Sequence, residues 1–381
     1  MTVQSSDVVV LVPGLLGFGS FGPKAAPVIS YFRHVQLELE RVFSSELQLA
    51  QLPQFYVHEP PPTGPLELRV SSLAVALEQL LAEQGGDTRF HIIGHSTGGV
   101  DARLLMNLEY LPPNGPSRVE KERLRARVAS VVSVAAPQHG AAFAENFGPL
   151  VPFVVAGPVS NVLSGLYLIS ILNAARAQHR SSDERYFAAA VVALIKSLVA
   201  PVTGSQQLVQ LATVLQPEVA AQVERFLQNI VDDHRLVDDL RPDAMRALNA
   251  RVAAGDTFPV RSFVTVSPPP GWSIEPARML YAAAYHWASP RHRRGAAFPR
   301  GEWLGPQPPG HDTPAANDGV VPSASQAHTQ SGGGGLPYLL LADHLDVVGH
   351  FSGIGETLFK SGSDFTPARF SELWRRVAHS L

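Results

Sequence analysis

One stretch, Arg89 to Val100, constrains the fold of this chain more than any other. It begins with a short apolar run rich in β-branched residues, which is typical of a buried strand. Gly94-x-Ser96-x-Gly98 follows at once, and apolar residues then recur at helical spacing through Met106. A strand, a tight turn and a helix are the context in which a serine sits in strained backbone with its hydroxyl exposed. The stretch therefore predicts a nucleophile elbow with Ser96 at its apex.

Two backbone groups beside this serine are predicted to bind a developing oxyanion. The first is the N–H of Thr97, because the start of a helix presents free N–H groups and a partial positive charge. The second is the N–H of Leu15, in the glycine-rich loop Pro13 to Gly19 after a first predicted strand. The spacing of that loop fits neither common phosphate-binding glycine motif, and a plain turn is the alternative interpretation.

The order of elements along the first 140 residues predicts the fold class. Buried strands and amphipathic helices alternate, which is the pattern of a doubly wound, mostly parallel sheet with helices on both faces. Ligands of such sheets bind at the carboxyl ends of the strands. We therefore expect residues 1–381 to form a single α/β domain of the hydrolase type. Besides the run before Ser96, the expected strands are 7–12, 55–58 and 128–135, and the expected helices are 31–49 and 66–83.

Two later stretches interrupt this alternation. Residues 146–235 are expected to form a helical cap or lid insertion, with a buried helical subdomain as the alternative. Charged residues are absent from 146–175, but proline and glycine break the run too often for a transmembrane span. Apolar cap helices indicate a hydrophobic substrate or binding at a lipid–water interface. Residues 268–314 are expected to be an irregular Pro/Gly-rich insertion. Helices are also expected over 238–252 and 371–381, with a strand over 260–266.

The composition excludes several classes of function. A net charge of -3 leaves no basic surplus to neutralise phosphates, so nucleic acid is not an expected partner. The chain has no cysteine, and therefore neither a disulfide framework nor a thiolate metal site. Residues 1–7 lack the basic start of a signal peptide, so we expect a cytoplasmic protein unless a leader has been removed.

A nucleophilic serine needs a base and an acid, and both have candidates near the C-terminus. In α/β-hydrolases the acid follows the serine along the chain and the histidine comes last. Asp318 lies in an Asn-Asp-Gly turn, and His344 lies in the last loop before a helix. A lone histidine or turn aspartate is usually structural, but this order favours a triad of Ser96, Asp318 and His344. The rivals are His350 for the base, and Asp312 and Asp343 for the acid.

Such a triad predicts a carboxylic-ester hydrolase that forms an acyl-enzyme. An acyltransferase or a polyester depolymerase uses the same triad, and differs only in what accepts the acyl group or supplies the ester. From another class, the alternative is a catalytically silent protein of the hydrolase fold that acts as a binding module. The presence of all three residue types counts against that alternative.

The assembled motifs resemble those of the true-lipase family of proteobacterial triacylglycerol lipases, the Pseudomonas and Burkholderia type. The resemblance is best over residues 7–145 and 314–350, and its most specific part is the Asn-Asp-Gly and His-Leu-Asp pair. It implies an α/β-hydrolase fold with a mobile helical lid, long-chain ester substrates, and Ser96, Asp318 and His344 as the triad. It also favours His344 over His350. The matching motifs are 10–18, 93–99, 133–140, 317–321 and 343–346.

The chain departs from this family at several points. Pro13 stands where the family has histidine, the family's disulfide cannot form, and members are secreted while no leader is seen here. Many members bind a structural calcium ion near the catalytic histidine, and Asp346 matches one of its carboxylates. The partner carboxylate is missing, because no aspartate occurs between Asp256 and Asp312, and calcium takes several oxygen ligands. We therefore expect no cofactor or metal, with Asp346 as the one calcium candidate.

Overall fold

A computed structural model describes residues 7–15, 17, 20–21, 29–49, 51–85, 88–147, 222, 225, 229, 233, 235–273, 275–289, 297–307, 311–328, 335–349 and 360–381. Seven of its strands form one sheet in the order β4-β1-β5-β6-β7-β9-β8, and all their pairings are parallel. Their bounds are β1 Val8–Val12, β4 Gln54–Val57, β5 Phe90–His95, β6 Val128–Val134, β7 Val260–Val266, β8 Glu302–Leu304 and β9 Tyr338–Leu341. A separate antiparallel pair joins β2 (Ser20–Phe21) and β3 (Ile29–Ser30).

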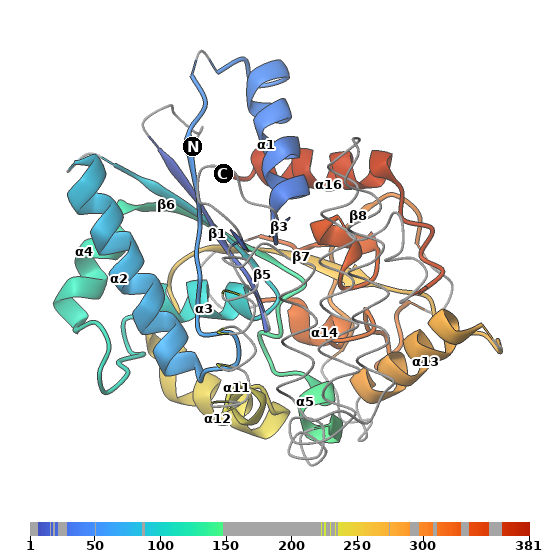
Figure 1. The fold of residues 1–381 in the computed structure, drawn as a ribbon. Helices are drawn as coiled ribbons and strands as arrows, with labels where there is room; N and C mark the ends of the chain where they lie inside the picture. Colours follow the sequence, from blue (N-terminus) through green and yellow to red (C-terminus); the bar gives the residue numbers. More distant parts are fainter. Residues whose placement is uncertain are drawn as a thin grey trace.

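Helices cover both faces of the sheet (Figure 1). α1 (Arg33–Ser45) and α16 (Pro367–Ala378) pack on one face, and α2 (Leu66–Gln84), α3 (Thr97–Met106) and α4 (Arg118–Arg127) pack on the other. Successive strand residues point to opposite faces, so a strand covered on both sides must be apolar throughout. The other helices of the described residues are α5 Ala142–Phe147, α11 Leu236–Asp239, α12 Pro242–Val252, α13 Pro276–Ala288 and α14 Ser323–Gln326, with 3₁₀ turns at Ala253–Gly255 and Asp346–Val348.

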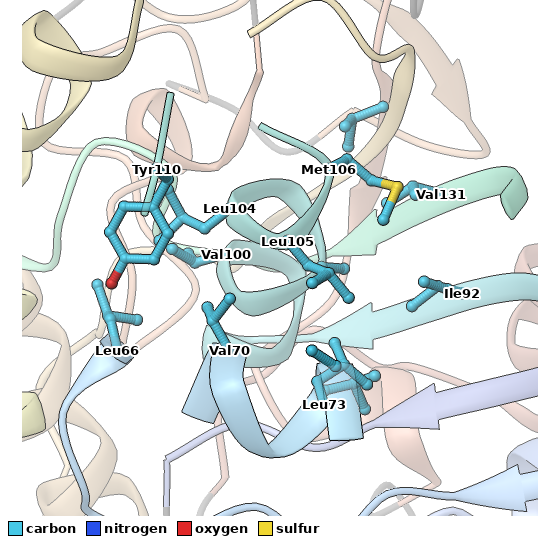
Figure 2. Close-up of a cluster of buried hydrophobic side chains, with 14 of the residues drawn as sticks. Leu66, Val70, Leu73, Ile92, Val100, Leu104, Leu105, Met106, Tyr110 and Val131 are labelled. Carbon is cyan, nitrogen blue, oxygen red and sulfur yellow. The ribbon is translucent and has the colours of Figure 1, made fainter. Parts of the chain in front are cut away.

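α3 is fixed on the sheet by a buried apolar layer that it shares with α2 (Figure 2). Leu73 of α2 and Leu105 of α3 meet Ile92 of β5, and each of the three is fully buried. Burying one side chain of this size contributes about 1.5–3 kcal/mol. The far end of α3 is capped by Lys121, whose ammonium donates to three backbone carbonyls, including that of Leu104 at 2.8 Å. The helix that follows Ser96 is therefore held along its length.

The loops after β1 and β5 meet at the topological switch point of the sheet. The helix that follows β1, α1, lies on one face, and the helix that follows β5, α3, lies on the other. Ligands of open parallel sheets bind in the crevice at such a point, beyond the carboxyl ends of the strands. The parallel sheet, its two helical layers and the strand–turn–helix at β5 make this an α/β-hydrolase fold.

Most of the expected elements are confirmed, and two expectations need correction. Residues 268–314 are not an irregular insertion throughout, because they contain α13 and the edge strand β8. The alanine-rich run after Pro276 favours a helix that starts at this proline, since proline suits the first helical turn. The helix expected over 238–252 is split into α11 and α12, because Pro242 starts a new helix. The predicted cap, 146–235, lies outside the described residues except for its ends and a few single positions.

Helices in the described part of the chain lack the combination of length and hydropathy that a bilayer span requires.

Candidate active site

Ser96 occupies a strained turn between β5 and α3. Its backbone has φ 54 and ψ -131, a positive φ that few residues other than glycine adopt. A Cβ on Gly94 would lie 2.3 Å from the Gly98 backbone, and one on Gly98 would lie 2.1 Å from the Val12 carbonyl oxygen. Only glycine fits at either position, which explains the spacing of the motif. The turn raises the serine above the carboxyl end of the sheet.

The structure brings the three predicted triad residues into one hydrogen-bonded chain. His344 Nε2 lies 3.0 Å from Ser96 Oγ, and His344 Nδ1 lies 2.8 Å from Asp318 Oδ2. All three residues are buried, and Asp318 is completely so. A carboxylate only accepts hydrogen bonds, so the proton of the neutral imidazole is on Nδ1 and Nε2 accepts from the serine hydroxyl. This arrangement can take a proton from Ser96.

Asp318 accepts hydrogen bonds from four further donors, and the sequence did not predict that these donors surround it. Its Oδ1 accepts from the backbone N–H groups of Val320 and Val321, at 3.0 and 2.7 Å. Its Oδ2 accepts from Thr265 Oγ1 at 2.6 Å and from Gln326 Nε2 at 3.0 Å. These bonds stabilise the negative charge and direct Oδ2 toward the imidazole. Thr265 is one of two polar residues, with Ser262, in the buried stretch of β7, and a polar residue in a buried strand was the one signal available.

The loop after β1 runs directly against the nucleophile. A Cβ on Gly14 would lie 2.5 Å from Ser96 Cβ and 2.9 Å from its Oγ. Leu15 follows in this loop and is half-buried, and Thr97 is the first residue of α3. The first N–H groups of a helix have no intrahelical acceptor. The two predicted oxyanion donors therefore belong to the two segments that flank Ser96.

A buried arginine binds the backbone of the loop after β1. Arg69 donates to the Pro13 carbonyl at 2.8 Å and forms an ion pair with Asp101 at 2.7 Å. Both side chains of the pair are almost completely buried. Burial raises the pKa of Asp101, and the neighbouring arginine opposes that rise. Because a buried charge that loses its partner is costly, the pair fixes the position of the loop.

The rival residues lie in other surroundings. Asp312 is exposed, and His350 lies outside the described residues. Asp343 is buried, and burial raises its pKa to about 6. Its Oδ1 accepts from the backbone N–H groups of Leu345 and Asp346, at 2.9 and 3.0 Å. This carboxylate therefore shapes the loop that carries His344, while Asp318 contacts the imidazole.

Asp346, the calcium candidate, is hydrogen-bonded to other protein groups. Its Oδ2 accepts from the backbone of Asp343 at 2.8 Å and from the hydroxyl of Ser363 at 2.7 Å. Within the described ranges, no three His, Asp or Glu side chains gather in a way that would hold a metal ion. Calcium takes six to eight oxygen ligands, and the expectation that this chain binds no metal stays a prediction.

No protein-family model matches the sequence, and no curated protein matches it. Solved structures of similar shape include EstA from Clostridium botulinum, at 18% identity over 98% of this chain and 90% of that one, with a TM-score of 0.49. Lipase 1 from Pelosinus fermentans is 16% identical over 98% and 99%, with a TM-score of 0.48. A metagenomic carboxyl esterase is 17% identical over 100% and 78%, with a TM-score of 0.45. Likenesses this distant do not carry an activity over to this chain.

Proposed function

We propose that this protein is a serine carboxylic-ester hydrolase that cleaves medium- to long-chain acyl esters. The observation that carries the proposal is the chain of hydrogen bonds from Ser96 through His344 to Asp318. The strained backbone of the serine and the glycine loop beside it support the same function. Strain of this kind persists only where the surrounding structure enforces it, and it is common at active sites.

The geometry is suited to a two-step acyl transfer. Ser96 Oγ attacks the ester carbonyl, and His344 Nε2 accepts the serine proton. The carbonyl oxygen becomes negative and accepts hydrogen bonds from the N–H groups of Leu15 and Thr97, each worth about 3 kcal/mol in comparable sites. His344 then gives the proton to the leaving alkoxide, and water attacks the acyl-enzyme by the same route. Asp318 stabilises the imidazolium in both steps.

The preference for longer acyl chains has a separate basis. It follows from the uncharged run 146–175, in the predicted cap, and from the resemblance to true lipases. An acyl chain is apolar, and each buried methylene contributes about 0.8 kcal/mol to binding. This part of the proposal is therefore tested separately from the chemistry.

The test is hydrolysis of p-nitrophenyl esters from acetate to palmitate, with Ser96→Ala as the control. We expect activity that rises toward the longer chains and disappears in Ser96→Ala. Undiminished activity of that variant would end the proposal, and a maximum at acetate would overturn the chain-length part. Failure to hydrolyse any ester, with transfer of the acyl group to an alcohol, would indicate an acyltransferase. A failure of both reactions would indicate a silent binding module.

A further inference from the structure

His95, the residue directly before the nucleophile, is buried beneath the triad and is not part of it. Its side chain is 1% exposed, and its ring centroid lies 4.9 Å from that of His344. His95 Nε2 lies 3.0 Å from the backbone carbonyl oxygen of His344. His95 Nδ1 lies 2.7 Å from the hydroxyl of Tyr31. Both ring nitrogens are therefore engaged, one of them with the loop that carries the catalytic base.

The direction of both hydrogen bonds is fixed by chemistry. A backbone carbonyl only accepts, so His95 Nε2 must carry a proton. In a neutral imidazole the other nitrogen is then an acceptor, and the Tyr31 hydroxyl donates to Nδ1. Tyr31 is itself 7% exposed, and burial raises its pKa well above the usual range, which keeps the hydroxyl protonated.

Tyr31 also contacts the loop after β1. The backbone of Gly14 lies near the Tyr31 hydroxyl and acts against the rise in its pKa. Only a donor stabilises the phenolate in this way, so the Gly14 N–H faces the tyrosine oxygen. Gly14 lies against Ser96 and precedes Leu15, the predicted oxyanion donor.

We propose that Tyr31 and His95 are positioning residues that join the oxyanion loop to the loop of the catalytic histidine. The relay runs from the Gly14 N–H to Tyr31, from the Tyr31 hydroxyl to His95 Nδ1, and from His95 Nε2 to the His344 carbonyl. It passes beneath Ser96 and connects the two segments that must be placed relative to it. Displacements of about 1 Å at such groups can cost a factor of about 100 in rate. The inference rests on the proposed function wherever its test measures ester hydrolysis.

The first test is Tyr31→Phe, which removes the hydroxyl and keeps the ring. The primary readout is the rate at which a fluorophosphonate labels Ser96, because this reaction needs no knowledge of the natural ester. The serine Oγ–P bond forms, fluoride leaves, and His344 accepts the serine proton. We expect labelling and kcat to fall about tenfold, with KM nearly unchanged, because the buried hydrogen bond to His95 and the contact with the Gly14 N–H are lost. Tyr110→Phe is the matched control, since this buried tyrosine follows the far end of α3.

The second test separates positioning from simple filling of the core. In His95→Gln the amide nitrogen can occupy the place of Nε2 and still donate to the His344 carbonyl. In His95→Asn the shorter side chain cannot reach it. We expect His95→Gln to retain most of the labelling rate and His95→Asn to lose about tenfold. Adding Tyr31→Phe to His95→Asn should cause little further loss, because residues that act as one unit are not additive.

Three results would overturn the relay: wild-type labelling of Tyr31→Phe, equal rates for the two His95 variants, or losses that multiply in the double variant. Thermal unfolding of each variant verifies that it is folded. If His95→Asn does not fold, the labelling rate of Tyr31→Phe alone decides whether the relay positions the catalytic residues. Labelling of the unchanged protein without ester hydrolysis would contradict the proposed function and leave the relay standing.

Discussion

The sheet holds two Ser–His–Asp sets, one at each end of β5. At the carboxyl end, His344 joins Ser96 to Asp318. At the amino end, His91 Nδ1 lies 2.8 Å from Ser130 Oγ, and His91 Nε2 lies 3.1 Å from Asp7 Oδ2. Both sets therefore place an imidazole between a hydroxyl and a carboxylate at hydrogen-bond distance. By distance alone, the second set resembles a catalytic triad as closely as the first.

Their surroundings differ in ways that matter for chemistry. Ser130 lies within strand β6, beside a shift in its pairing register with β5, whereas Ser96 has a positive φ and stands directly before a helix. The carboxylate of Asp7 also forms an ion pair with Arg89 at 2.9 Å, so its charge is balanced by a guanidinium. Helices follow the carboxyl ends of parallel strands, and their partial positive charge is therefore concentrated at that edge.

The comparison leads us to expect that a hydrogen-bonded triad alone is not sufficient for catalysis. A nucleophile also needs donors aimed at the oxyanion, and both the strained backbone of Ser96 and the predicted donors of Leu15 and Thr97 lie at the carboxyl edge. We therefore expect the set at Ser96 to determine activity and the set at His91 to determine stability.

Replacing the two histidines should give the largest contrast. His344→Ala is expected to lower kcat by about 10⁴-fold or more, because the serine loses its base. His91→Ala should leave kcat within about twofold, since it affects only buried contacts remote from the oxyanion donors. His350→Ala, at the rival base, should also retain most activity. Ester kinetics on folded proteins measure all three, and equal losses at His344 and His91 would refute the division.

The two aspartates provide the second contrast. Asp318→Asn is expected to lower kcat by about 10⁴-fold, because the amide favours the wrong imidazole tautomer. Asp7→Asn should preserve kcat and lower the free energy of unfolding by about 1–3 kcal/mol, through weaker bonds to His91 and Arg89. Urea unfolding measures the second effect. A large loss of kcat in Asp7→Asn would contradict a purely structural role for the amino-edge set.

The pH dependence of stability sharpens the comparison further. Burial lowers the pKa of His91 below its ordinary value of 6.5, and the hydrogen bond to Asp7 opposes this shift. As the pH falls, the imidazole of His91 is therefore protonated in the unfolded chain before it is protonated in the folded protein. The stability that the neutral imidazole contributes is present above pH 6.5 and is lost as the pH falls below that value. His91→Gln removes the titration and should flatten the decline by up to about 1.4 kcal/mol per pH unit. Urea unfolding across this range measures the slope, and identical slopes would refute the assignment.

Chelation should have the smallest effect. The carboxylate of Asp346, near the catalytic loop, is engaged by Asp343 and Ser363. We therefore expect EDTA to leave both ester hydrolysis and the thermal midpoint nearly unchanged. A large drop in either, restored by added calcium, would show that the protein binds the ion after all.

The fold class and the position of the elbow could be predicted from the sequence alone, because both depend on neighbouring residues. An apolar run before Gly94-x-Ser96-x-Gly98 and a helical pattern after it can form only a few local structures. The α4 helix was missed although its signal is local, since Ser117 and Glu120 form a capping box. The strand β9, directly before the loop of His344, was missed because its run of four residues is short. Short apolar runs do not distinguish a strand from a helix.

Which polar residues meet depends on contacts between distant parts of the chain, and the sequence did not predict these contacts. Thr265 contacts Asp318 across 53 positions of the chain, and Tyr31 contacts His95 across 64. His91 and His95 occur in the same strand, yet one joins the amino-edge set and the other supports the catalytic loop. Both residues are histidines of β5, so residue type and position in a strand do not distinguish them. The partner of each side chain is set by strand register and by the packing of distant loops, and these are properties of the whole fold.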